Sequence, residues 1–191
     1  MQMPAEKIIL FGQIFGICLA VLSFFVYLQK SREKILITKI ILDILNVFQH
    51  AMVGAYTGSV INGIAVLREF VFYHKDNKKW AGSRIWLFVF LFLMIAASLI
   101  SWQGYISFLP TIGSSLVVIG FYCSNPRLIR ILGILGQSFW LLYSGIVFNL
   151  GGILGSALCI FGGIIGLIKN DEDKTKWKKE EDNESNTVFH E

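Results

Sequence analysis

Charge is scarce in this chain and is confined to short stretches. Only 16% of the 191 residues are Asp, Glu, Lys or Arg, and 54% are hydrophobic, whereas about a quarter of a soluble domain is usually charged. The mean hydropathy is +0.62. This composition excludes an ordinary soluble domain and indicates a protein whose solvent is the lipid bilayer. The formal net charge of +4 comes from basic connections, so we expect no nucleic-acid partner.

Catalytic and metal-binding patterns are also missing. Cys18, Cys123 and Cys159 stand singly inside apolar runs, without the CxxC or Cys/His spacing of a metal site or a disulfide framework. The chain has no Ser-His-Asp set, phosphate-binding glycine loop, His-x-x-x-His pair or paired carboxylates. We therefore expect neither enzyme activity nor a bound cofactor or metal, and we interpret the cysteines as small apolar fillers.

What the chain does have is long apolar runs. A membrane-spanning helix needs roughly 17–25 predominantly apolar residues. We place seven spans near residues 8–28, 35–56, 59–73, 85–102, 105–122, 128–148 and 150–168, of which the third is the shortest. The sequence therefore predicts an all-α membrane protein with seven transmembrane helices.

The connections between these runs alternate in charge. The first, third and fifth are basic, whereas the second, fourth and sixth hold no Lys or Arg. Because basic connections stay in the cytoplasm, this alternation predicts an outer amino terminus and a cytoplasmic carboxyl terminus. Residues 170–191 are rich in Lys, Glu, Asp and Asn, and we expect a disordered cytoplasmic tail there.

A weak internal repeat relates the two halves of the chain. A shift of 94 positions lays Gly58 on Gly152 and Val53 on Val147, and it also pairs polar residues: Asp43 with Gln137, His50 with Ser144, and Asn62 with Ser156. Residues 8–75 would form one three-helix repeat and residues 105–169 a second, with 85–102 as the linker helix within a transmembrane domain of residues 1–169. A single linker span makes the two repeats parallel, an arrangement known in transporters.

Several polar residues interrupt the apolar runs, notably Asp43, His50, Asn62, Arg68 and Glu69. An ionisable group in hydrocarbon costs roughly 2.5–3.5 kcal/mol on insertion scales, so it needs a partner or a water-filled cavity. Asp43 has two interpretations, an ion pair with Lys39 or Arg68 and a proton or cation site. Arg68 and Glu69 lie within six residues of the end of their run, so we expect them to reach the membrane interface.

The remaining two polar residues also leave two readings open. His50 would be either a hydrogen-bonded packing residue or a proton relay. Asn62 would either bond a neighbouring helix or contact a solute. Lys39, Asp43, Asn46 and His50 recur at intervals of three and four, so they share one helical face.

Several segments resemble the YgjV-type bacterial inner-membrane proteins, over about residues 8–168. They are QHAMVGAY at 49–56, ING at 61–63, LPTIG at 109–113, the glycine pair 151–152, and Arg68. More distantly, the three-plus-one-plus-three plan is similar to the SWEET and PQ-loop superfamily of sugar and small-solute carriers. The WLLYS segment at 140–144 resembles an aromatic segment of that superfamily, and Asn62 takes the place of its substrate-contacting asparagine. No Pro-Gln pair follows the first or fifth span, and Ser156 stands where a second asparagine is expected.

These observations give two hypotheses of different classes. The first is a multi-pass carrier of the bacterial cytoplasmic membrane that moves a small polar solute, with a substrate site formed by Asn62, Ser156, Asp43, Gln137, His50 and Trp140. The second is a membrane scaffold or partner protein whose polar residues only lock helices together. The bilayer is the expected partner of both, and a homo-oligomer is compatible with either. A polar cavity at mid-depth favours the carrier, and a dry bundle with a paired Asp43 favours the scaffold.

Overall fold

The described part of the chain is mostly helical. The computed structural model describes residues 5–123 and 125–188, with side chains for 6–123 and 125–169. Within these ranges, no strand is present, which confirms the all-α prediction. The helices are α1 (Ala5–Val26), α2 (Arg32–Met52), α3 (Tyr56–Tyr73), α4 (Ile85–Ile100), the short 3-10 helix η1 (Tyr105–Ser107), α5 (Phe108–Tyr122), α6 (Pro126–Ile146) and α7 (Leu150–Val188).

Each predicted apolar run contains one helix, but only five helices are long and apolar enough to cross a membrane by length and composition. These stretches are Glu6–Val26, Arg32–Met52, Tyr105–Tyr122, Pro126–Ile146 and Leu150–Lys169 among the described residues. α4 is apolar but only 16 residues long, and α3 carries Arg68 and Glu69 within its 18 residues. The seven-span arrangement therefore stays a prediction at α3 and α4.

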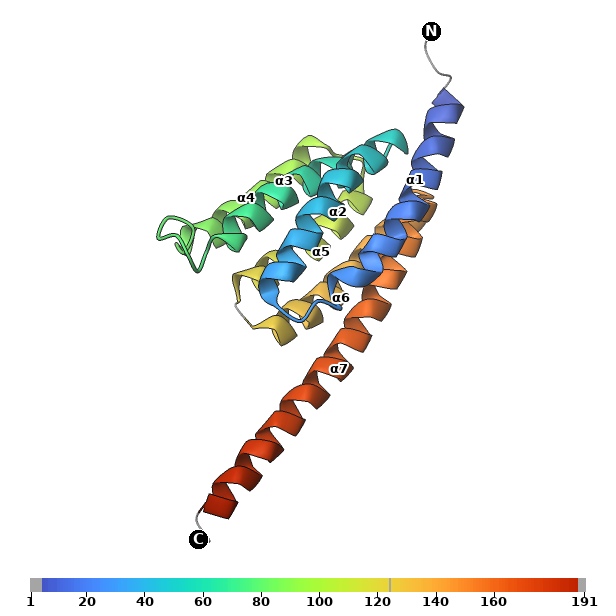
Figure 1. Cartoon of the computed structure of the whole chain (residues 1–191). Coiled ribbons are helices and arrows are strands. Elements are labelled where there is room, and N and C mark those ends of the chain that lie inside the picture. Colours follow the sequence, from blue (N-terminus) through green and yellow to red (C-terminus); the bar gives the residue numbers. More distant parts are fainter. Residues whose placement is uncertain (1–4, 124, 189–191) are drawn as a thin grey trace.

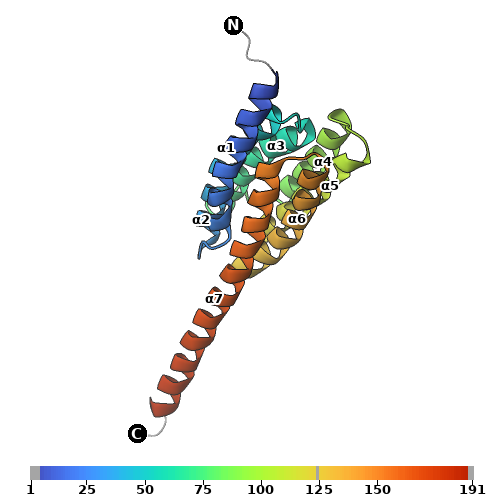
Figure 2. The ribbon, with the colours of Figure 1, turned by 90° about the vertical axis from the view of Figure 1, so that its right-hand side faces the viewer.

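The helices pack as a ring. α1 lies against α2 and α7, α2 against α3, α3 against α5, α5 against α6, and α6 against α7, while α4 packs outside the ring on α3 and α5. Figures 1 and 2 both show α1 alongside the first part of α7, and Figure 1 shows α4 far from that pair. Consecutive helices are antiparallel, because Gly12 of α1 approaches Met52 of α2. α1 and α7 are parallel, because Gly16 meets Gly151 and Phe24 meets Gly162.

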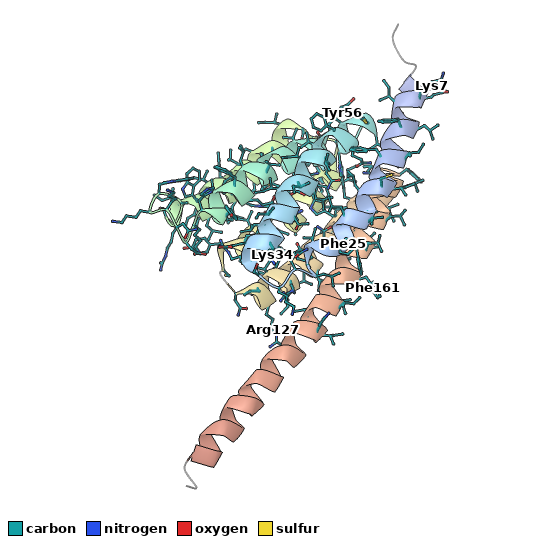
Figure 3. The ribbon with its side chains drawn as sticks, viewed as in Figure 1. Lys7, Phe25, Lys34, Tyr56, Arg127 and Phe161 are labelled. Carbon is teal, nitrogen blue, oxygen red and sulfur yellow. The ribbon has the colours of Figure 1, made fainter. Side chains whose placement is uncertain are left out.

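Because consecutive helices are antiparallel, the connections between them lie alternately at two opposite ends of the bundle. At one end, Arg32 reaches Asp76 at 2.7 Å, and Arg130 Nε donates to the Tyr27 carbonyl at 3.0 Å. The α1–α2, α3–α4 and α5–α6 connections therefore meet here, and we call this the basic end. At the opposite end, Gln103 Nε2 donates to the Gly54 carbonyl at 3.3 Å. We call it the amide end, and Figure 3 shows Lys34 and Arg127 far from Tyr56 and Lys7.

The 94-residue shift reappears in the local structure. α2 and α6 are both 21 residues long and begin and end 94 positions apart. Their N-caps are Ser31 and Asn125, each of which accepts a backbone N–H with its side chain. After them the chain turns through a residue with positive φ, 76° at Gly54 and 53° at Phe148. The equivalent turns and caps support the predicted repeat register.

Apolar side chains cover the outside of the bundle and polar ones line its inside. Phe88, Phe92, Phe25 and Phe161 are 46–70% exposed, and Figure 3 shows Phe161 at the outer edge of the bundle. Asp43, Arg68 and Glu69 are at most 1% exposed. Such a distribution is stable only where lipid surrounds the helices, because lipid cannot solvate polar groups.

The last helix extends well beyond the bundle (Figure 1). α7 continues to Val188, although the sequence predicts a disordered tail over 170–191. The side chains of 170–188 and all of 189–191 lie outside the described set, so the disordered cytoplasmic tail stays a prediction.

Candidate functional site

A polar cavity lies inside the ring of helices, with walls from α1, α2, α3, α5, α6 and α7. Its volume is about 50 Å³ for the centres of water-sized molecules, and one water needs roughly 10–15 Å³ on that measure. It therefore holds a few waters or one small solute. The lining residues used below are Gly16, Ser23, Lys39, Asp43, Asn46, His50, Asn62, Arg68, Ser114, Gln137, Trp140, Ser144, Gly151, Gly152, Gly155, Ser156 and Cys159.

All six residues of the predicted substrate site line this cavity. Asp43 and His50 come from α2, Asn62 from α3, Gln137 and Trp140 from α6, and Ser156 from α7. Their meeting is what the predicted 94-residue repeat leads one to expect, since equivalent positions of two packed repeats would face each other across the axis that relates them. Their binding of a substrate stays a prediction.

His50 and its neighbours form the part of the cavity nearer the amide end. His50 Nδ1 lies 3.0 Å from the Asn46 carbonyl, so Nδ1 carries the proton and Nε2 of the neutral ring is an acceptor. Among the described residues, neither Nε2 nor Ser144 Oγ has a hydrogen-bond partner. Trp140 packs edge-on to His50 with ring centroids 5.5 Å apart and donates to Ser114 Oγ at 3.2 Å. Buried polar atoms without a partner indicate that water or a solute belongs here.

His50 therefore combines the two roles that the sequence left open. One ring nitrogen makes the packing hydrogen bond, and the other is available to a cavity ligand. Asn62 is similar, because its amide Nδ2 donates to the Gly58 carbonyl of its own helix at 2.9 Å while the side chain still lines the cavity. The expected bond from Asn62 to a neighbouring helix is not the one observed.

Glycines bring α7 close enough to complete the wall that carries Ser156. A Cβ atom at Gly151 would stand 2.4 Å from Gly16 Cα, and one at Gly152 would stand 2.4 Å from Ser144 Oγ. Real Cβ atoms do not approach other atoms so closely. The dense glycines of this helix therefore set its distance from α1 and α6, as small residues do at membrane helix contacts.

Four charged side chains are buried at the side of the cavity nearer the basic end. Lys39 Nζ lies 2.7 Å from Asp43 Oδ1, and Arg68 Nη2 lies 2.8 Å from Glu69 Oε1. The pairing of Asp43 with Lys39 is confirmed, so Asp43 is not the free carboxylate that a simple proton site requires. Arg68 pairs with Glu69 and not with Asp43.

The expectation that Arg68 and Glu69 reach the membrane interface is wrong. Their exposed fractions are 1% and 0%, and Arg68 Nη1 donates inward to the Ser114 carbonyl at 3.3 Å. The physical reason is the helical period. Positions 58, 62, 65 and 69 lie on one face of α3, so Glu69 shares the face of Asn62 and cannot turn toward lipid.

The cavity lies between two sets of contacts that join residues 8–75 to residues 105–169. At the amide end, the side-chain amides of Gln49 and Asn149 exchange hydrogen bonds of 2.8 and 3.1 Å, and Gln13 Nε2 donates to the Phe148 carbonyl at 2.9 Å. At the basic end, Arg32 donates to the Phe121 carbonyl at 3.4 Å, and Lys75 Nζ donates to the Tyr122 carbonyl. Partial burial lowers the pKa of this Lys75 ammonium, and the nearby Arg32 charge lowers it further.

Sequence reasoning missed several lining residues. Ser114 and Ser23 gave no signal, because serine is common inside membrane helices. Cys159 was interpreted as an apolar filler, yet it is 1% exposed and lines the cavity with the charged groups. Its position three residues after Ser156 places it on the same helical face, which is a readable signal. Among the described residues, no group of three His, Cys, Asp or Glu side chains is placed to hold a metal ion.

A family model described as Imp-YgjV, bacterial inner membrane protein, matches residues 10–174. No curated protein and no solved structure matches the chain.

Proposed function

The chain belongs to the Imp-YgjV family of bacterial inner membrane proteins, and from this premise we propose that it carries a small polar solute across that membrane. The single observation that carries the proposal is the cavity, to which both repeats contribute polar side chains. Asn62 and Ser156 would hydrogen-bond the solute, with Gln137, His50 and Trp140 shaping the rest of the site. Contacts at both ends of the cavity resemble the closed gates of a carrier between two open states.

The proposed movement is a rocking of α1–α3 against α5–α7. The two groups pack together mainly along α1 with α7 and α3 with α5. Breaking the Gln49–Asn149 pair would open the amide end, and breaking the Arg32 and Lys75 contacts to α5 would open the basic end. The basic end would face the cytoplasm, because basic connections are retained there. The amino terminus would then lie outside and the carboxyl terminus inside.

The solute is expected to be neutral. Lys39 is paired with Asp43 and Arg68 with Glu69, so these charged groups hold each other and not an ionic solute. The unpartnered His50 Nε2 is an acceptor, and Ser144 Oγ both donates and accepts. A small hydroxylated compound or amide suits such groups, and the cavity limits its size in this conformation to a few non-hydrogen atoms.

The second candidate function is a membrane scaffold or partner protein. The observation in its favour is that Asp43 and Asn62 already have partners within the bundle. The cavity and its unpartnered polar atoms favour the carrier, since helices that only need to be locked together gain nothing from unsatisfied buried groups.

Solute-dependent stabilisation of the purified full chain tests the proposal. A ligand that binds only the folded state stabilises it, by about 2.7 kcal/mol at a hundred times its Kd. We expect a neutral polyol or amide from a broad panel to raise the unfolding temperature of the wild type and of Asn77→Ala, a control in the exposed α3–α4 connection. The shift should be lost in Asn62→Ala. No shift with any compound, or an equal shift in Asn62→Ala, would refute the site.

Cysteine labelling separates the carrier from the scaffold. Cys159 lines the cavity, so in a Cys18→Ser/Cys123→Ser background it is the remaining thiol. A carrier that opens to water exposes Cys159 to a small hydrophilic thiol reagent, and a stabilising solute should slow that labelling. A scaffold with a permanently closed bundle leaves Cys159 unlabelled until it unfolds.

A further inference from the structure

The buried charge cluster contains two carboxylates that touch each other. Asp43 and Glu69 are 1% and 0% exposed. One carboxylate oxygen of each forms an ion pair, Asp43 with Lys39 and Glu69 with Arg68. No donor from the described part of the chain reaches the other oxygens, Asp43 Oδ2 and Glu69 Oε2. The two side chains nevertheless lie within hydrogen-bonding contact of each other.

Two ionised carboxylates cannot make a hydrogen bond, because both are acceptors only. Like charges in contact also repel strongly where water is excluded, and such pairs hold a proton between them. One added proton would give the pair a donor and convert the contact into an O–H···O⁻ bond. Since Asp43 lines the cavity, water in the cavity gives the proton a route to the pair.

We propose that Asp43 and Glu69 share one proton and form a proton-binding site beside the solute cavity. Binding adds the proton to a carboxylate oxygen, needs no other reactant, and changes the cluster from neutral to one net positive charge. The charged or titratable groups around the pair are Lys39 and His50 of α2, Arg68 of α3, Tyr27 at the end of α1 and Cys159 of α7. α5 and α6 contribute the neutral Ser114 and Gln137 to the same cavity.

Arg68 links this proton to the second repeat. Its guanidinium holds Glu69 with Nη2, donates through Nη1 to the Ser114 carbonyl of α5, and stacks 5.4 Å from the centre of the Phe121 ring. Protonation reduces the negative charge of Glu69 and so weakens its attraction for Arg68. The Arg68 guanidinium can then interact more strongly with α5. The proton would thus bias the α3–α5 contact, one of the two along which the repeats would rock. This coupling step rests on the proposed function, whereas the proton site does not.

Infrared difference spectroscopy of the full chain in lipid nanodiscs tests the site directly. We expect the wild type to show the carbonyl stretch of a protonated carboxyl at neutral pH, with a shift in heavy water and loss of the band as pH rises. The band should be absent from Asp43→Asn and from Glu69→Gln, whose amides can donate the missing hydrogen bond. It should remain in Glu33→Gln, which removes an exposed carboxylate of α2.

The outcomes decide between the claims. A wild type with no protonated-carboxyl band from mildly acid to mildly alkaline pH overturns the proton site, as does a band that survives in both variants. Because the wild type alone answers the first question, a variant that fails to fold does not remove the test. If the band is present but no solute stabilises the protein, the proton site is supported and the carrier is refuted. If a solute stabilises the protein but the band is absent, the carrier is supported and the proton site is refuted.

Discussion

A close approach of two helices gives the sharpest prediction, for Gly151→Ala. A methyl group at this position would stand 2.4 Å from Gly16 Cα and 2.6 Å from its carbonyl carbon, whereas ordinary contact begins at 3.4 Å. Both atoms are backbone, so no side-chain rotation relieves the clash, and α1 and α7 have to separate by about 1 Å. A gap of that size forfeits a quarter to a half of the dispersion energy of the contacts it opens.

The expected cost is about 1–3 kcal/mol of unfolding free energy, the usual range for overpacking. Gly145→Ala is the matched control, because no atom lies within 4 Å of the added methyl group. Gly151 and Gly145 are each the second residue from a helix end, so the change in helix propensity is similar and small. We expect Gly145→Ala to stay within about 0.5 kcal/mol of the wild type.

The measurement is unfolding of the purified full chain in mixed micelles titrated with a denaturing detergent, followed by far-ultraviolet circular dichroism. Gly151→Ala should unfold at a lower detergent fraction than the wild type and Gly145→Ala at about the same one. If Gly151→Ala matches the wild type, or if both variants lose the same stability, the close approach of α1 and α7 is not the constraint described.

Three further predictions concern the ends of the bundle. In a double-mutant unfolding cycle, Gln49→Ala and Asn149→Ala should show a coupling free energy of about 1 kcal/mol, because the pair makes two hydrogen bonds and such bonds in membranes average about 0.6 kcal/mol each. Additive losses of stability would contradict the pairing of these two side chains. Arg32→Met should lower the unfolding free energy by about 1–3 kcal/mol, because charge-assisted hydrogen bonds are lost. Asp76→Ala should lower it by less than about 0.5 kcal/mol, because Asp76 is 57% exposed. Equal losses in the two variants would contradict this prediction. Reporters on the two chain termini should be active on opposite sides of the membrane, and activity on one side would disprove the proposed topology.

Much of the fold could be predicted because composition and charge act over whole segments. The alternation of basic and uncharged connections identified which connections share an end, and the structure gathers them so. The repeat register of 94 was visible from a few residues such as Gly58 and Gly152, and it recurs in the bounds of α2 and α6. Helix length was harder to predict at α3 and α4, where apolar runs are short and caps are weak.

The site could be predicted as a set of residues but not as a set of contacts. Polar residues at matched depths had to face inward, which brought Asp43 and Gln137 to one cavity. The pairing of Arg68 with its chain neighbour Glu69 was missed because the prediction relied on how close the two residues are to the helix end. The face of the helix on which they lie was the better guide. The touching carboxylates of Asp43 and Glu69 depend on how α2 crosses α3, which no spacing within one helix can specify.

The two ends of the bundle are closed by different chemistry, and this difference has an electrical consequence. Gln49 and Asn149 hold the amide end with neutral groups, whereas Arg32 and Lys75 hold the basic end as cations that donate to carbonyls of α5. Dissolved salt weakens the interactions of partly exposed charges, with a screening length of about 10 Å at 0.1 M, and leaves amide pairs nearly unaffected. Raising the salt concentration should therefore weaken the closure of the basic end and leave that of the amide end unchanged. The salt concentration on either side of the membrane would then influence which end opens more easily.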